Sequence, residues 1–349
     1  MEELQKSEIH FLQRLQESFS NYEGVMLTIS HLGDPRNAFL LYFPIAFCFI
    51  NAKAGLQVLW VAVVSEWLNA VLKWILIGQR PYWWVMESPV FFGEERPFIK
   101  QFRLTCETGP GCPSGHAMVT SAVWFVLISS INEVIVSEAT PKYSHHIATV
   151  KRLMWFLFAL MATVVSISRV FIATHFPHQV ILGVVNGVLL GITVRKYPVE
   201  NYGFGRYFLG GLFAITSVIL EYYVLSYAGL NPDWSMKLAL KRCVFREWVH
   251  MDTSPFYAIS RDVGAFFFAG MMCSCLTLNY DPVRGHYPRR LSATLLTVAA
   301  AQVIESIHLP RSYVFLFYML GALKYGMVAM TTIGLNQAVT YFGGSSPTS

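Results

Sequence analysis

Long apolar runs, separated by short polar segments, make up most of the chain. Nine runs of about 20 residues are long enough to cross a bilayer as helices, at 26–49, 55–77, 116–135, 152–173, 178–195, 207–228, 258–278, 289–309 and 313–342. The polar sequence GDPRN, Gly33 to Asn37, interrupts the first run, and the fifth is short. The pattern predicts an all-α, polytopic transmembrane bundle of about nine spans.

The composition supports a single membrane-embedded domain over residues 1–349. Hydrophobic residues make up 54% of the chain and charged residues only 13%, whereas a soluble domain carries about 25% charged residues. The net charge of +5 is spread along the loops, which gives no support for nucleic-acid binding. A lipid bilayer is the partner that such a surface requires.

The first 25 residues have a different pattern. They are acidic and lack the apolar core of a cleavable signal peptide. Their apolar residues fall roughly on one helical face, namely Leu4, Phe11, Leu12, Leu15 and Phe19. We therefore predict an amphipathic segment that lies on the membrane surface.

Basic residues indicate which side each loop occupies. The short loops after the first, third, fifth and seventh runs contain Lys53, Lys142, Lys151, Arg152, Arg195, Lys196, Arg206, Arg284, Arg289 and Arg290. The positive-inside rule assigns these loops to the cytosol. The N-terminal segment and the loops 78–115, 174–177 and 229–257 then lie on the opposite side. Those loops also carry cations, which need another explanation.

Three polar motifs lie at ends of the predicted spans. They are KWILIGQRP (Lys73 to Pro81), PSGH (Pro113 to His116) and SRVFIATH (Ser168 to His175). The second and fourth spans run in one direction and the third runs back, so all three motifs reach the same membrane face. Such convergence is what an active site assembled from distant segments requires.

The cations of these motifs suit a phosphate ligand. Lys73, Arg80 and Arg169 supply a compact ammonium and two planar guanidinium forks. Ser114 and Gly115 begin the third span, where backbone N–H groups and the helix dipole favour an anion. We predict that these five residues surround a phosphoryl group.

Two histidines complete the predicted chemistry. His175 and His116 provide one imidazole to attack phosphorus and one to handle the proton of the leaving group. Three cations would repel a bound metal, and no cluster of carboxylates accompanies them. We therefore expect neither a metal nor an organic cofactor.

The motifs resemble the signature of the type 2 phosphatidic acid phosphatase superfamily, K-x6-RP, PSGH and SR-x5-H-x3-D, over a catalytic core at about 55–195. CETGPGCPSGHAM, SRVFIATHFPHQVILG and EWVHMDTSPF are more closely similar to the catalytic subunits of glucose-6-phosphatase. The sequences HLGDP and Ser260 to Asp262, with the C-terminal LFYMLGALKY, favour the ubiquitous third branch of that family. The resemblance extends over almost the whole chain.

The resemblance implies roles for individual residues. His175 would form a phosphohistidine, and His116 would protonate the departing sugar oxygen and then deprotonate the attacking water. Asp34 would contact sugar hydroxyls, unless it only pairs with Arg36. Glu107 and His178 would line the pocket.

One position departs from the superfamily signature. The aspartate that orients the nucleophilic histidine is replaced by Gln179. The amide oxygen of Gln179, a backbone carbonyl or another carboxylate could hold the tautomer of His175. A disulfide between Cys106 and Cys112 is a further open possibility, if their loop faces an oxidising compartment.

The resemblance implies hydrolysis of glucose 6-phosphate in the lumen of the endoplasmic reticulum by a multi-pass membrane enzyme. The glucose-6-phosphate transporter would be its functional partner, because the substrate has to reach the lumen. Two alternatives use the same cations: a lipid phosphatase of the same superfamily and a sugar-phosphate transporter. The polar Asp34 argues against the first. The chain lacks the internally similar halves that many transporters have.

Overall fold

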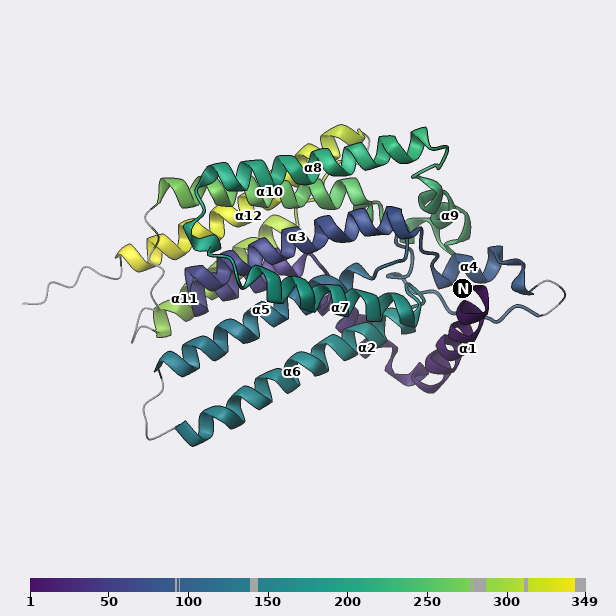
Figure 1. Ribbon diagram of the computed structural model, residues 1–349, viewed down its shortest axis with the longest axis horizontal. Coiled ribbons are helices and arrows are strands. Elements are labelled where there is room, and N and C mark those ends of the chain that lie inside the picture. Colours follow the sequence, from purple (N-terminus) through teal and green to yellow (C-terminus); the bar gives the residue numbers. More distant parts are fainter. Residues whose placement is uncertain are drawn as a thin grey trace, which may run out of the picture.

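The computed structural model describes residues 1–91, 93, 95–138, 144–276, 278, 287–310 and 313–342 as a long bundle of helices (Figure 1). The α-helices are α1 (Glu2–Ser18), α2 (Glu23–Leu32), α3 (Ala52–Leu76), α4 (Pro81–Glu87), α5 (Gly115–Glu138), α6 (Ser144–Phe171), α7 (Pro177–Val194), α8 (Phe204–Tyr227), α9 (Trp234–Arg242), α10 (Pro255–Cys275), α11 (Tyr287–Glu305) and α12 (Val314–Phe342). The predicted all-α class is confirmed.

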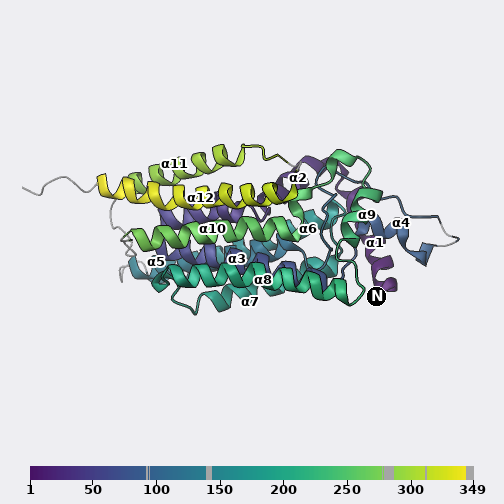
Figure 2. The ribbon, with the colours of Figure 1, turned by 90° about the horizontal axis from the view of Figure 1, so that it is seen from above.

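Most of the long helices lie side by side along the bundle, as two views at right angles show (Figures 1 and 2). Six segments of the described residues are long and apolar enough to cross a membrane: Ala52–Phe91, Gly115–Ser137, His146–Phe171, Pro177–Val194, Phe204–Tyr227 and Val314–Val339. The chain is therefore a multi-pass membrane protein. The count of nine spans is not confirmed, although each of the second to ninth predicted runs corresponds to one helix.

The first predicted span was wrong as a single helix. α2 ends at Leu32, and the chain continues through a turn into two π-helical segments, Ala38–Tyr42 and Ile45–Ile50. Pro35 lies in the turn, where a proline disfavours the helical conformation of the residue before it. Pro44 lies between the two π-helical segments and has no N–H to donate, although the backbone stays helical there. The break leaves the polar sequence GDPRN beside the end of the bundle that carries the three motifs.

Glycines on α7 let it approach α5 closely. A Cβ atom at Gly183 would lie 2.6 Å from the carbonyl oxygen of Ser114, and one at Gly187 would lie 2.2 Å from that of Met118. Gly191 faces α5 in the same way, so the three glycines form a stripe at four-residue spacing. This contact fixes the N-terminus of α5, with its PSGH motif, against the start of α7.

The predicted amphipathic segment forms α1, which lies at the same end of the bundle as α4 and α9 (Figure 1). Ile9 and Leu12 of α1 are buried against the protein, whereas Leu4 and Phe11 are exposed. One part of the apolar face therefore packs on the bundle, and the other remains available for a membrane surface.

The disulfide joins a different pair of cysteines from the one considered above. Cys106 is bonded to Cys243, and Cys112 is a free thiol. The pairing links the loop before α5 to the end of α9, across a sequence separation of 137 residues. Local spacing could not reveal a partner so far along the chain.

Candidate active site

The residues of the three motifs meet at one end of the bundle. Lys73 lies in the last turn of α3 and Arg80 directly precedes α4; His116 begins α5, and Arg169 and His175 lie at and beyond the end of α6. The side chains of Arg80, Arg169 and His175 are almost completely buried. The convergence predicted from span direction is therefore present in the structure.

Two of the turns that carry these residues have an unusual backbone. Ile77 and Ala173 have φ values of 48° and 58°, a left-handed conformation that costs a residue with a side chain about 1–3 kcal/mol. Ile77 follows the turn of Lys73, and Ala173 lies between Arg169 and His175. The N–H of His175 donates to the carbonyl of Arg169 at 3.3 Å, which closes this turn.

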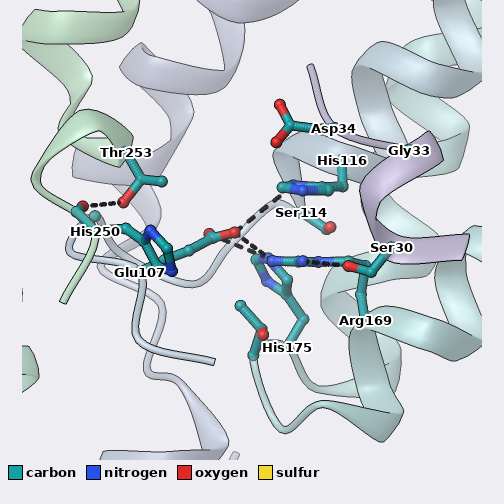
Figure 3. A network of polar contacts seen from close by, with 12 residues as sticks. Ser30, Gly33, Asp34, Glu107, Ser114, His116, Arg169, His175, His250 and Thr253 are labelled. Carbon is teal, nitrogen blue, oxygen red and sulfur yellow. Dashed lines mark hydrogen bonds and ion pairs between the residues drawn. The ribbon is translucent and has the colours of Figure 1, made fainter. Parts of the chain in front are cut away.

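The carboxylate of Glu107 lies at the centre of the site (Figure 3). Its Oε2 is 2.9 Å from Nη1 of Arg80, and Oε1 forms an ion pair with Nη2 of Arg169. Nδ1 of His116 is 3.6 Å from Oε1, and Nε2 of His175 is 3.9 Å from Oε2. Both imidazoles and both guanidinium groups therefore face one small anionic group. The sequence placed Glu107 only in the lining of the pocket.

The charges of the site determine the protonation of its central groups. Burial alone would raise the pKa of Glu107, but Arg169 and Arg80 outweigh it and hold that pKa well below its usual value. Burial and the positive charge of Arg80 lower the pKa of His175 well below its usual value, against the opposing effect of Glu107. Glu107 is therefore ionised and His175 neutral at pH 7.

A backbone carbonyl orients His175. Nδ1 is 2.7 Å from the carbonyl oxygen of Gly111, whereas Oε1 of Gln179 is 3.4 Å away. The Gln179 amide instead accepts from the N–H of Phe176 and donates to the carbonyl of Gln79. With Nδ1–H donating to Gly111, the lone pair of Nε2 faces the site. Of the three groups that could replace the aspartate, the structure therefore favours a backbone carbonyl, that of Gly111.

Arg80 is held by the loop that precedes α5. Its Nε donates to the carbonyl of Gly109 at 2.7 Å and its Nη2 to that of Pro110 at 3.1 Å. Nη1 is 3.3 Å from the carbonyl of Thr174 and 3.4 Å from Nε2 of His175. The guanidinium thus has a fixed orientation, with one edge toward the anion site.

Arg169 has a partner that the sequence did not indicate. Its Nη1 donates to the hydroxyl of Ser30 on α2 at 2.7 Å, and Ser30 is buried. Nε of Arg169 has no hydrogen-bond partner among the described residues. A serine in an apolar helix carries no signal of this role; only the folding of α2 against α6 creates it.

Some predicted contacts differ in the structure. The N–H of Ser114 donates to the carbonyl of Gln179 at 3.1 Å, so it is not free for a phosphate. Gly115 does line a cavity at the site, and other predicted site residues line it too, namely Asp34, Lys73, Glu107, His116 and Arg169, whereas Arg80 and His175 are not part of this lining. His178 points away from the cavity and is bound to Glu8 of α1, with its Nδ1 2.7 Å from Oε2. His175 lies three residues earlier, in the turn before α7, whereas His178 lies in the first turn of α7, so the two imidazoles point in different directions.

Asp34 lines the cavity and also pairs with Arg36. Oδ2 of Asp34 is 2.6 Å from Nη2 of Arg36, and the backbone N–H of Arg36 donates to Oδ1 at 2.9 Å. Figure 3 shows the Asp34 carboxylate next to the ring of His116. Both roles considered for Asp34, a contact with sugar hydroxyls and an ion pair with Arg36, are therefore compatible with its position.

Among the described residues, no group of three or more His, Cys, Asp or Glu side chains is arranged to hold a metal ion.

Comparisons with known proteins show which sequences this chain is similar to. The PAP2 superfamily profile matches residues 54–202, which contain all three motifs. The chain is 36% identical over 350 residues to glucose-6-phosphatase 2 of Homo sapiens, with 95% of each chain covered. It is 35% identical over 326 residues to glucose-6-phosphatase catalytic subunit 1 of Bos taurus, covering 92% of this chain and 90% of the relative. The chain belongs to the glucose-6-phosphatase family. No solved structure matches it.

The cavity of this glucose-6-phosphatase family member extends beyond the three motifs. Polar and charged residues from the turn after α2, from mid-α3, from the loop before α10 and from α10 itself line its other walls, namely Arg36, Glu66, Asn69, His250, Asp252, Thr253 and Arg261. Nη2 of Arg261 is 2.7 Å from Oε1 of Glu66. The sequence EWVHMDTSPF marked the loop as similar to the family, but its approach to the cavity depends on tertiary structure.

Proposed function

We propose that this protein hydrolyses glucose 6-phosphate to glucose and phosphate through a phosphohistidine intermediate. The observation that carries the proposal is the set of four side chains around one carboxylate: Arg80, Arg169, His116 and His175 all face Glu107. A phosphoryl group in that position would meet two guanidinium forks and two imidazoles. Lys73, which lines the same cavity, would add a third positive charge.

In the first step, Nε2 of His175 attacks phosphorus and the bond from phosphorus to the sugar oxygen breaks. His116 gives its proton to that oxygen, so glucose leaves as an alcohol. Arg80 and Arg169 stabilise the charge that spreads over the phosphoryl oxygens. The Gly111 carbonyl supports the step, because a hydrogen bond from Nδ1–H keeps the lone pair on the attacking nitrogen.

In the second step, water attacks the phosphohistidine. His116 accepts a proton from the water, the bond between phosphorus and Nε2 breaks, and inorganic phosphate is released. His175 returns to its neutral form, which the burial of its ring favours. Each histidine thus ends the cycle as it began.

We further propose that the site faces the lumen of the endoplasmic reticulum, and that the glucose-6-phosphate transporter supplies the substrate there. The Cys106–Cys243 disulfide lies in loops at the same end of the bundle as the site, and disulfides persist in oxidising compartments. Basic loops such as the one with Arg195 and Lys196 lie at the opposite end, in accordance with the positive-inside rule. We also propose that the chain belongs to the third branch of the family, on the basis of its sequences HLGDP and LFYMLGALKY.

Trapping the intermediate tests the chemistry. The full-length protein is incubated with glucose 6-phosphate labelled on phosphorus, denatured in alkali to preserve phosphohistidine, and mapped by mass spectrometry. We expect label on His175 and none in His175→Ala. His178→Ala is the matched control, because His178 lies three residues away and is bound to Glu8 of α1 instead of facing Glu107, so this variant should retain the label. Label elsewhere, or faster hydrolysis of phosphatidic acid than of the sugar phosphate, would contradict the proposal.

A further inference from the structure

An anion already occupies the place that the proposed function gives to the phosphoryl group. The carboxylate of Glu107 contacts Arg80 and faces the imidazole of His175. It also contacts Arg169 and faces His116 (Figure 3). We propose that Glu107 is a resident anion that competes with phosphate: the substrate displaces its carboxylate, and its return helps to expel the phosphate product. This inference rests on the proposed function, because it takes the arginine pair as the phosphate site.

The competition follows from the contacts. Glu107 is bound by Nη1 of Arg80 and by Nη2 of Arg169, the donors that face the site. The other donors are already used: Nε and Nη2 of Arg80 bind the carbonyls of Gly109 and Pro110, and Nη1 of Arg169 binds Ser30. A phosphate dianion needs the same two edges. An ionised carboxylate in van der Waals contact with a dianion would repel it strongly in a buried site. Both anions therefore cannot occupy the position together.

The backbone of Glu107 is fixed, so only its side chain can move. Its carbonyl accepts from the hydroxyl of Tyr82 at 2.9 Å, its N–H donates to the carbonyl of Thr105 at 2.9 Å, and a β-bridge pairs it with His250. The neighbouring Cys106 is tied to Cys243. The side chain itself lines the cavity, so displacement by the substrate requires it to rotate along this wall and away from the arginines.

A resident anion has two consequences for the enzyme. It keeps Arg80 and Arg169 paired and oriented when the site is empty, so that two buried guanidinium groups are not left without a partner. It also weakens the binding of every phosphate-containing ligand, including the product. Release of inorganic phosphate from so cationic a site would otherwise be slow. An alternative role is purely structural: Glu107 would hold the arginines in place, and its loss would then weaken phosphate binding.

The two roles predict opposite changes in phosphate affinity. Glu107→Gln keeps the size of the side chain and removes its charge. We expect inorganic phosphate to inhibit hydrolysis of glucose 6-phosphate by Glu107→Gln with an inhibition constant about tenfold or more below that of the wild type. The full-length protein in lipid nanodiscs is used, and binding of labelled phosphate is measured directly as a second readout. An unchanged or higher inhibition constant would overturn the inference.

A matched control and a second variant complete the test. Glu87→Gln also removes a carboxylate that pairs with two cations on the same side of the membrane, Lys241 and Arg242, but outside the cavity; its inhibition constant should not change. Glu107→Asp keeps the charge but shortens the reach, so it too should bind phosphate more tightly and covers the case in which Glu107→Gln fails to fold. If the wild type shows no competitive inhibition by phosphate, the proposed function itself fails, which is a different outcome from an unshifted variant.

Discussion

Ser30 provides a sharp test of how the phosphate site is assembled. Its hydroxyl, buried on α2, accepts a hydrogen bond of 2.7 Å from Nη1 of Arg169. Nε of the same guanidinium has no hydrogen-bond partner among the described residues. When Glu107 moves aside for the substrate, Ser30 remains as a side-chain anchor of Arg169 in the described part of the chain. We therefore regard Ser30 as a positioning residue for Arg169.

Ser30→Ala removes this anchor without changing the charge of the site. A hydrogen bond to a charged group contributes about 1.5–3 kcal/mol, and about 1.4 kcal/mol corresponds to a factor of ten in rate. We expect kcat/KM for glucose 6-phosphate to fall by about 10- to 100-fold. The loss should appear in kcat as well as in KM, because Arg169 has to meet the transferring phosphoryl group in a fixed orientation. Phosphate release from reconstituted full-length enzyme measures both constants.

Thr28→Ala is the matched control for this experiment. Thr28 lies one half-turn earlier on α2 and is exposed, and its hydroxyl donates to the carbonyl of Gly24 on its own helix at 2.8 Å. We expect that variant to keep wild-type kinetics. If Ser30→Ala and Thr28→Ala have equal kcat/KM, or if Ser30→Ala changes only the thermal stability, the positioning role is refuted.

Three further predictions concern packing, the disulfide and pH. Gly187→Val places a side chain against the Met118 carbonyl, where a Cβ would lie at 2.2 Å. It should destabilise the fold by more than the ~1–3 kcal/mol of ordinary overpacking, whereas Gly205→Ala, whose Cβ would enter open space, should not. Size-exclusion profiles and thermal melts compare the two variants. Cys243→Ser should lower the free energy of unfolding by about 2–5 kcal/mol. The double variant Cys106→Ser/Cys243→Ser should lose no more than this, because both changes remove the same bond, and Cys275→Ser, which changes a free cysteine, is the control. A clearly larger loss in the double variant would contradict the pairing. Burial and Arg80 lower the pKa of His175, so its ring stays neutral as the pH falls through the ordinary imidazole pKa of about 6.5. After correction for substrate ionisation, the acid limb of kcat/KM should therefore lie clearly below that ordinary value, and a limb at the ordinary value would contradict this assignment.

The sequence predicted the helical part of the fold well because hydrophobic length is a local property. Each apolar run from the second to the ninth became one helix, since a run of about 20 apolar residues can satisfy its backbone only in that form within a membrane. The first run failed because Pro35 and Pro44 break the helical hydrogen-bond pattern. GDPRN marked the interruption, but no local rule gave the π-helical turns that follow.

The candidate site was predictable to a different extent. Lys73, Arg80, His116, Arg169 and His175 could be grouped because their motifs have fixed spacing and the direction of the spans brings them to one face. The partners of these residues could not be inferred in the same way. The approach of Ser30 to Arg169 and of the Gly111 carbonyl to His175 depends on how separate segments pack, and the spacing of residues within a motif carries no such information.

The position of Glu107 shows why charge counts alone misjudge such a site. Counted along the motifs, three cations and two histidines predict an empty and strongly positive pocket. In the folded chain, the loop between α4 and α5 brings one carboxylate into contact with both arginines, because two buried guanidinium groups without a counter-charge would be costly. An anion site of this kind must therefore contain its own anion when the substrate is absent. Its affinity for phosphate is then the difference between two sets of contacts, and a change at Glu107 should alter that difference without changing the arginines themselves.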